Sequence, residues 1–180
     1  QNKLVPRRGG VILVINSGEE GLGNLLGCRR IMETFGDRMT EFYSLDGMGG
    51  EVHAMSVGSR RYRVEVRTEG GHSYGNFGNR NAIVYLASMI ETLYQIKVPE
   101  NGKSTFNIGT VSGGTSVNTI AQQAEMLYEI RSDCRESLDS LDHHFQAVVT
   151  CYRLKGIEVN VELVGERPCK GDVDADRQQA

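Results

Sequence analysis

Several common functional signals are missing from this sequence of 180 residues. No apolar stretch approaches the roughly 20 residues that a membrane-spanning helix needs, and no signal-peptide pattern stands at Gln1. A net charge of −3 leaves no basic excess of the kind that binds nucleic acid. No internal repeat or low-complexity segment is present. We therefore expect a globular protein with no nucleic-acid partner and no membrane partner.

The cysteines count against two further kinds of protein. They stand far apart and show no C-x-x-C spacing, at Cys28, Cys134, Cys151 and Cys169. Neither a zinc knuckle nor a disulfide framework has this pattern. A reducing, cytoplasmic location is the simpler expectation for such a chain.

Two adjacent glutamates, Glu19 and Glu20, are the most informative feature that the sequence does contain. They follow the apolar run 11–15, which predicts a strand buried on both faces, as in a parallel sheet covered by helices. In such sheets the functional crevice lies beyond the carboxyl ends of the strands. Adjacent carboxylates repel each other unless a cation or a proton absorbs their charge, so the pair suggests a metal ligand beside a general base. Gly18 and Gly21 allow the backbone to turn sharply there.

The first part of the chain, up to about residue 58, is predicted to be α/β. Apolar spacing predicts a helix over 22–35 and a short strand over 42–45. Asp46 then lies at the carboxyl end of a strand, as the glutamate pair does. Taken alone, a Glu-Glu-Gly sequence is more often a solvated turn, and an aspartate among glycines is a routine turn former.

The pattern changes after residue 58 to strands and helices that each keep one apolar face. Alternating apolar residues predict strands, and apolar residues at helical spacing predict helices. The expected order is strand 61–67, helix 82–94 with Asn79 as its cap, strand 105–111, strand 124–131, helix 138–152 and strand 157–164. This βαββαβ order is ferredoxin-like, so residues 59–167 are predicted to form a complete α+β domain.

Three polar side chains of this domain fall where a regular element would not place them. His72 follows the first strand, among glycines, and its imidazole can offer an N–H to a developing negative charge. Asn118 offers an amide donor and acceptor, and Arg131 offers a guanidinium that matches a carboxylate bidentately. If Asn118 and Arg131 share one edge of the domain, they form a clamp for an anionic group. Individually, each of the three is more often an ordinary turn or surface residue.

The motifs, in their order along the chain, resemble the zinc-dependent aminoacylase and carboxypeptidase family, which includes acetylornithine deacetylase, succinyl-diaminopimelate desuccinylase, glutamate carboxypeptidase and allantoate amidohydrolase. The matching stretches are NSGEEGLG, SLDGMGG, SRRYRVEVRTEGGHS, FNIGTVSGGTSVNTI and MLYEIRSD. The resemblance spans most of the chain. It implies part of a three-layer α/β catalytic domain at 1–58, a lid and dimerisation domain at 59–167, and a return into the catalytic domain at 168–180.

The resemblance also implies roles for the acidic residues. Glu19 would be the general base for the attacking water, and Glu20 and Asp46 would be ligands of two zinc ions, or of cobalt or manganese in their place. The family's further ligands, from a His-x-Asp motif, a bridging aspartate and a late histidine, have no counterpart in this sequence. Two carboxylates do not complete a dinuclear zinc site. We therefore expect the chain by itself to be inactive.

The lid residues receive roles in the same way. His72, Asn118 and Arg131 match residues that bind the substrate or its oxyanion, with His72 reaching into the site of the partner subunit of a homodimer. The implied reaction is cleavage of an amide or peptide bond in an N-acyl amino acid or a dipeptide-like substrate with a free carboxylate. The alternative is a non-catalytic ferredoxin-like module that only dimerises. A His-x-Asp segment encoded upstream of Gln1 would distinguish the two hypotheses.

Overall fold

The computed structural model describes residues 9–45 and 56–169. The chain divides into two compact units, Gln1–Asp46 and Gly47–Ala180, and each is described by itself. Most of the predicted return segment, residues 170–180, lies outside the described residues. Within the described part, every helix is too short or too polar to cross a membrane.

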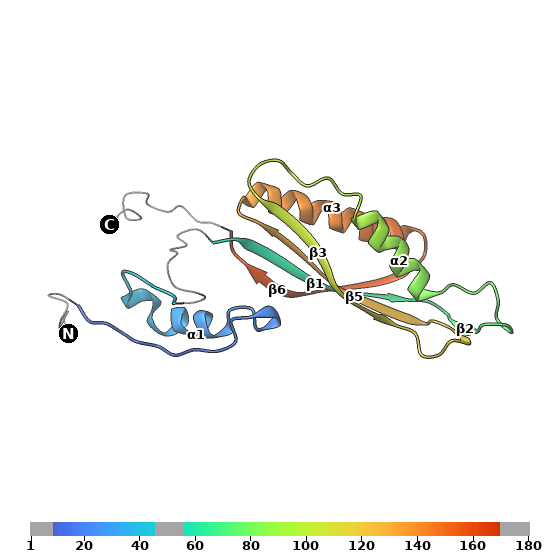
Figure 1. Cartoon of the computed structure of the whole chain (residues 1–180), viewed down its shortest axis with the longest axis horizontal. Coiled ribbons are helices and arrows are strands. Elements are labelled where there is room, and N and C mark those ends of the chain that lie inside the picture. The colour runs from blue at the N-terminus through green and yellow to red at the C-terminus, as the bar shows by residue number, and fades with distance from the viewer. Residues whose placement is uncertain (1–8, 46–55, 170–180) are drawn as a thin grey trace. The chain divides into compact units, whose positions relative to one another are not determined.

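The second unit is built on a four-stranded antiparallel sheet with the strand order β3-β5-β1-β6 (Figure 1). Its long elements follow one another as β1 (Gly58–Arg67), α2 (Ala82–Leu93), β3 (Ser104–Gly113), β5 (Gln123–Ser132), α3 (Arg135–Leu154) and β6 (Glu158–Arg167). Two short strands, β2 (Gly71–His72) and β4 (Thr119–Ile120), pair with each other. The predicted ferredoxin-like βαββαβ order is confirmed.

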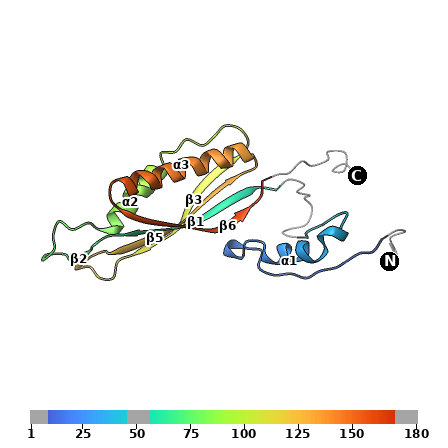
Figure 2. The same ribbon diagram turned by 180° about the vertical axis from the view of Figure 1, so that it is seen from behind.

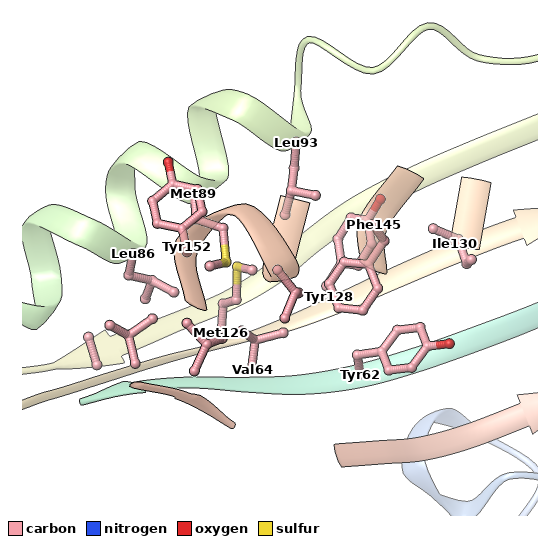
Figure 3. Packing of buried hydrophobic residues seen from close by; sticks show 14 of the residues in the cluster. Tyr62, Val64, Leu86, Met89, Leu93, Met126, Tyr128, Ile130, Phe145 and Tyr152 are labelled. Atoms are coloured by element: carbon pink, nitrogen blue, oxygen red, sulfur yellow. The ribbon is translucent and has the colours of Figure 1, made fainter. Parts of the chain in front are cut away.

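The hydrophobic core lies between the sheet and the two helices α2 and α3, which cover the same face (Figure 2). Alternate side chains of β1 and β5 point to this face because successive residues of a strand point to opposite sides. Phe145 of α3 stacks between Tyr62 and Tyr128, with ring centroids 4.6 and 5.0 Å apart. Figure 3 shows this packing, and the labelled residues are all buried: Tyr62, Val64, Leu86, Met89, Leu93, Met126, Tyr128, Ile130, Phe145 and Tyr152.

The amino-terminal end of α2 differs from the prediction. Asn81, and not Asn79, is the N-cap, and its side chain accepts a hydrogen bond of 3.0 Å from the Ile83 N–H. Asn79 instead donates from its amide to the Gly70 carbonyl at 2.7 Å. Both asparagines have side chains suited to capping, so the tertiary contact with Gly70 decides which of the two caps the helix.

The first unit contains one α-helix, α1 (Leu26–Phe35), among its described residues 9–45. Short 3-10 turns precede and follow it, η1 (Gly21–Gly23) and η2 (Gly36–Arg38). The helix predicted over 22–35 is therefore present in its greater part. None of its side chains is buried.

The two strands predicted for the first unit are not formed. Segments 11–15 and 42–45 are extended or irregular chain and pair with no strand among the described residues. Leu13 and Ile15, predicted to be buried, are 86% and 96% exposed. A buried strand needs neighbouring strands for its N–H and C=O groups and helices over both faces, whereas residues 9–45 supply no paired strand and a single α-helix.

Candidate functional site

The glutamate pair lies in a closed loop that leads into α1. Gly18 and Gly21 have φ values of +79° and +51°, so the backbone reverses around the pair as predicted. The Gly18 carbonyl accepts from the Leu26 N–H at 3.0 Å, and the Glu20 carbonyl accepts from the Gly23 N–H at 2.9 Å. The loop is thus held by its own backbone hydrogen bonds.

Glu19 has two polar neighbours that the sequence did not single out. Asn16 Nδ2 donates to Glu19 Oε1 and also, at 3.6 Å, to Cys28 Sγ. Partial burial, followed by the hydrogen bond to Glu19, raises the pKa of the Cys28 thiol, so the thiol is protonated at neutral pH. Asn16 shares the glutamate turn and was recognisable from its position. Cys28 was not, because it comes from the following helix.

The acidic residues described here do not form a metal centre. Glu20 is exposed at the start of η1, and Asp46, the second predicted ligand, lies outside the described residues. Among the residues that the structure describes, no three His, Cys, Asp or Glu side chains gather closely enough to hold a metal ion. Zinc takes three or four protein ligands, usually with imidazole or thiolate among them. Glu20 with Asp46 therefore does not suffice as a zinc site.

The pairing of β2 with β4 places His72 and Asn118 at diagonal positions on neighbouring segments. His72 is the register partner of Thr119, and the Ser73 N–H donates to the Asn118 carbonyl at 3.0 Å. Both residues are exposed. We call this region, residues 70–79 and 114–121, the tip; β2 marks it at one end of the sheet in Figure 1.

Arg131 lies far from the tip. Strand β5 begins at Gln123, beside the tip, and Arg131 is its penultimate residue. At about 3.3 Å per residue, Gln123 and Arg131 are roughly 25 Å apart along the strand. The structure therefore does not bring Arg131 next to Asn118 within the second unit, and a clamp of these two residues does not form there.

The guanidinium of Arg131 is engaged by a neighbouring carboxylate. Its Nε donates to Glu129 Oε1 at 2.7 Å and its Nη2 to Glu129 Oε2 at 3.3 Å, and Arg61 binds the same carboxylate. Burial opposes ionisation of Glu129, but the hydrogen bonds from Arg131 and Arg61 outweigh it and lower the pKa of Glu129. An anionic ligand would have to share Arg131 with Glu129.

Solved structures share this fold. An aminopeptidase, PepT, from Bacillus cereus ATCC 10987 aligns with a TM-score of 0.64 at 21% identity, over 91% of this chain and 44% of its own. An aminobenzoyl-glutamate utilization protein from Klebsiella pneumoniae aligns with a TM-score of 0.62 at 20% identity, over 71% of this chain and 35% of its own. At these identities the likeness establishes the fold alone.

The sequence comparisons establish the family. An N-acetyldiaminopimelate deacetylase from Bacillus pumilus (strain SAFR-032) is 28% identical over 102 residues, which cover 55% of this chain and 26% of the relative. The chain thus spans about a quarter of the length of this curated relative. A family model described as the peptidase dimerisation domain matches residues 55–152, more than half of the chain, and agrees with the family that the motifs resemble. The chain belongs to the peptidase dimerisation domain family.

Proposed function

We propose that this chain is part of a hydrolase that cleaves an amide or peptide bond in an N-acyl amino acid or a dipeptide-like substrate with a free carboxylate. The observation that carries the proposal is the tip, where a domain of the peptidase dimerisation family holds His72 and Asn118 on two neighbouring chain segments, both exposed. An imidazole N–H and an amide N–H can each donate to a substrate oxygen, including that of a tetrahedral intermediate. The deacetylase relative, by its name, removes an acetyl group from an amine, which is chemistry of the same class.

The separation of Arg131 from the tip supports a site that two copies of the chain share. One substrate cannot contact two groups that are separated by most of the length of β5, roughly 25 Å. In a homodimer, one copy would supply His72 and Asn118 while the other supplies Arg131 for the substrate carboxylate. Strands β3 and β6 are the edges of the sheet, and an edge strand can continue pairing across a two-fold axis.

The acidic residues complete the proposal. Glu19 would take a proton from the attacking water and return it to the leaving amine. Glu20 and Asp46 would bind a divalent metal ion, zinc or in its place cobalt or manganese, together with ligands from outside the described residues. In this arrangement residues 1–58 belong to a catalytic domain, 59–167 form its lid and dimerisation domain, and 168–180 return to the catalytic domain, in a cytoplasmic enzyme.

Extending the chain by the sequence encoded on both sides, and assaying it on N-acyl amino acids and dipeptides, tests this function. We expect the extended protein to release the free amino acid and to lose that activity on Glu19→Ala, while the 180-residue chain shows none. Subunits with His72→Ala and subunits with Arg131→Ala should each be inactive and should regain activity on mixing, because one site of the mixed dimer keeps both residues. If no His-x-Asp segment precedes Gln1 and no turnover appears, a non-catalytic dimerisation module is the better description.

A further inference from the structure

The ring of His72 accepts hydrogen bonds from the turn that follows it. Its Nδ1 lies 3.3 Å from the backbone nitrogen of Tyr74 and 3.2 Å from that of Gly75. A backbone N–H only donates, so Nδ1 is the acceptor and the hydrogen of the neutral imidazole is on Nε2. Nε2, across the ring from the turn, is therefore left as an outward donor on an exposed side chain.

Asn118, like His72, has its hydrogen-bond acceptor occupied and its donor left over. The Ser116 hydroxyl donates to Asn118 Oδ1 at 2.7 Å, which occupies the acceptor end of the amide. Its NH2 group makes no hydrogen bond with any residue in 9–45 or 56–169. The donor end of the amide is thus the end that remains for a ligand.

We propose that the tip itself sets His72 and Asn118 as hydrogen-bond donors, ready for an oxygen that carries negative charge and no hydrogen. The parts that set this polarity are the Tyr74 and Gly75 N–H groups and the Ser116 hydroxyl. Donors that are oriented before charge develops need no reorganisation, which is the source of their strength in catalysis. The use of this donor pair in turnover rests on the proposed hydrolase function, whereas its polarity is a property of the tip alone.

Asn76 closes the turn that carries the two N–H donors. Its Oδ1 accepts from the His72 N–H at 2.9 Å, and its own N–H donates to the His72 carbonyl at 2.9 Å. Gly71, with φ of +135°, makes room for it, since a Cβ at Gly71 would lie 2.8 Å from Asn76 atoms. Asn76 is therefore a positioning residue that acts through His72.

Two other histidines provide internal references. The Nδ1 of His144 lies 2.7 Å from the Ser140 carbonyl oxygen, which only accepts, so this ring carries its hydrogen on Nδ1. His143 is exposed and makes no hydrogen bond with the described residues, so its ring is free to average between the two forms. The geometry thus predicts opposite tautomers for His72 and His144 in one molecule.

Nitrogen NMR of the isotope-labelled 180-residue chain tests this inference without requiring activity. At a pH two units above the ordinary histidine pKa of about 6.5, ring nitrogens with and without a hydrogen resonate in separate regions. Single His→Gln substitutions assign the signals. We expect the nitrogen chemical shifts of His72 to be those of the pure Nε2–H form. The shifts of His144 should approach those of the Nδ1–H form, and those of His143 should lie between the two. A His72 signal pair that matches the averaged pair of His143 would overturn the inference.

Substitutions in the turn separate orientation from simple folding. Gly75→Pro removes one of the two N–H donors, and one hydrogen bond of this kind shifts a tautomer ratio about 3- to 10-fold. Gly75→Ala is the matched control, because it keeps the N–H and its Cβ would lie 3.9 Å from the His72 ring. Asn76→Ala should likewise move the His72 chemical shifts toward those of the averaged tautomers. Asn76→Asp, which keeps an acceptor for the His72 N–H, should restore the shifts of the pure Nε2–H form.

The outcomes distinguish this inference from the proposed function. Unchanged amide signals of β5 show that each variant is folded, so a loss of the pure Nε2–H shifts of His72 in Gly75→Pro alone supports the orienting role. Equal His72 shifts in Gly75→Pro, Gly75→Ala and the parent chain would refute that role whatever the activity of the extended protein. Failure of the extended protein to turn over substrate, with the pure Nε2–H shifts of His72 intact, would refute the proposed function and leave the orienting role standing.

Discussion

The two units of this chain contain similar apolar runs, but the run is buried in the second unit and largely exposed in the first. In the second unit Val64 and Val66 are fully buried, because β5 and β6 pair with β1 and two helices cover it. In the first unit Leu13 and Ile15 are almost fully exposed. An apolar run thus predicts burial only where the same chain also supplies the strands and helices that bury it.

The largest change in stability is expected from a substitution in the core of the second unit. Phe145 is fully buried between two tyrosine rings, so Phe145→Ala is expected to lower the free energy of unfolding by about 3–5 kcal/mol. Denaturant titration measures the change. Leu13→Ala is the matched control in the first unit and should change stability by less than about 0.5 kcal/mol, because Leu13 is exposed. A large loss for Leu13→Ala would mean that the apolar run is packed after all.

A second prediction concerns how low pH affects stability through Glu69, the residue that precedes the tip. The Arg80 backbone N–H and then its guanidinium, both 2.9 Å from Glu69 oxygens, help to lower the pKa of Glu69 to about 2. A carboxyl group with a lowered folded-state pKa stabilises the fold above the unfolded pKa, about 4.3, and loses this contribution as the pH falls toward 2. We expect Glu69→Gln to flatten the stability profile between pH 5 and about 2.

The matched control for the acid prediction is Glu91→Gln. Glu91 is an exposed residue of α2 that has no hydrogen bond or ion pair with the described residues. Its replacement removes a carboxyl group without removing a contact, so the profile of this variant should follow that of the parent. Identical profiles for Glu69→Gln and the parent would show that the Glu69–Arg80 pair contributes nothing to stability.

The third prediction tests which asparagine caps the first turn of α2. Asn81→Ala removes the cap and should cost about 1 kcal/mol of unfolding free energy. Asn79→Asp keeps an oxygen acceptor but removes the amide donor that binds Gly70, so it should loosen the tip without shortening the helix. Hydrogen exchange of the first turn of α2 separates the two, because only Asn81→Ala should speed exchange there.

The smallest effect is expected in the first unit. Because the Glu19 carboxylate helps to raise the pKa of the Cys28 thiol, Glu19→Gln should lower that pKa and increase the thiolate fraction. Alkylation of Cys28 at pH 8 should then become faster, because the thiolate is the reacting species. Cys151, an exposed cysteine of the second unit, is the internal reference and should not change. Slower alkylation of Cys28 would contradict the contact with Glu19.

Much of the second unit was predictable because each strand and helix carries its own pattern. In β5, Ala124, Met126, Tyr128 and Ile130 alternate with polar or half-buried neighbours, and this alternation correctly indicated the buried face. The cap of α2 was not predictable in the same way, since a contact with Gly70 distinguishes Asn79 from Asn81. The hydrogen-bond partners of His72 and Asn118 were equally hidden, although Asn76 and Ser116 are both residues typical of turns.

The sequence by itself determined the order of elements in the second unit, the apolar face of each, and the residue types able to bind an anionic group. Only the tertiary structure decided which of those residues meet. Pairing of β2 with β4 places His72 and Asn118 on neighbouring segments at one end of the sheet, while the extended length of β5 separates Arg131 from both. The physical reason is that local periodicity depends on nearby residues, whereas a site depends on which distant strands pair and on how far a strand carries a side chain from its start.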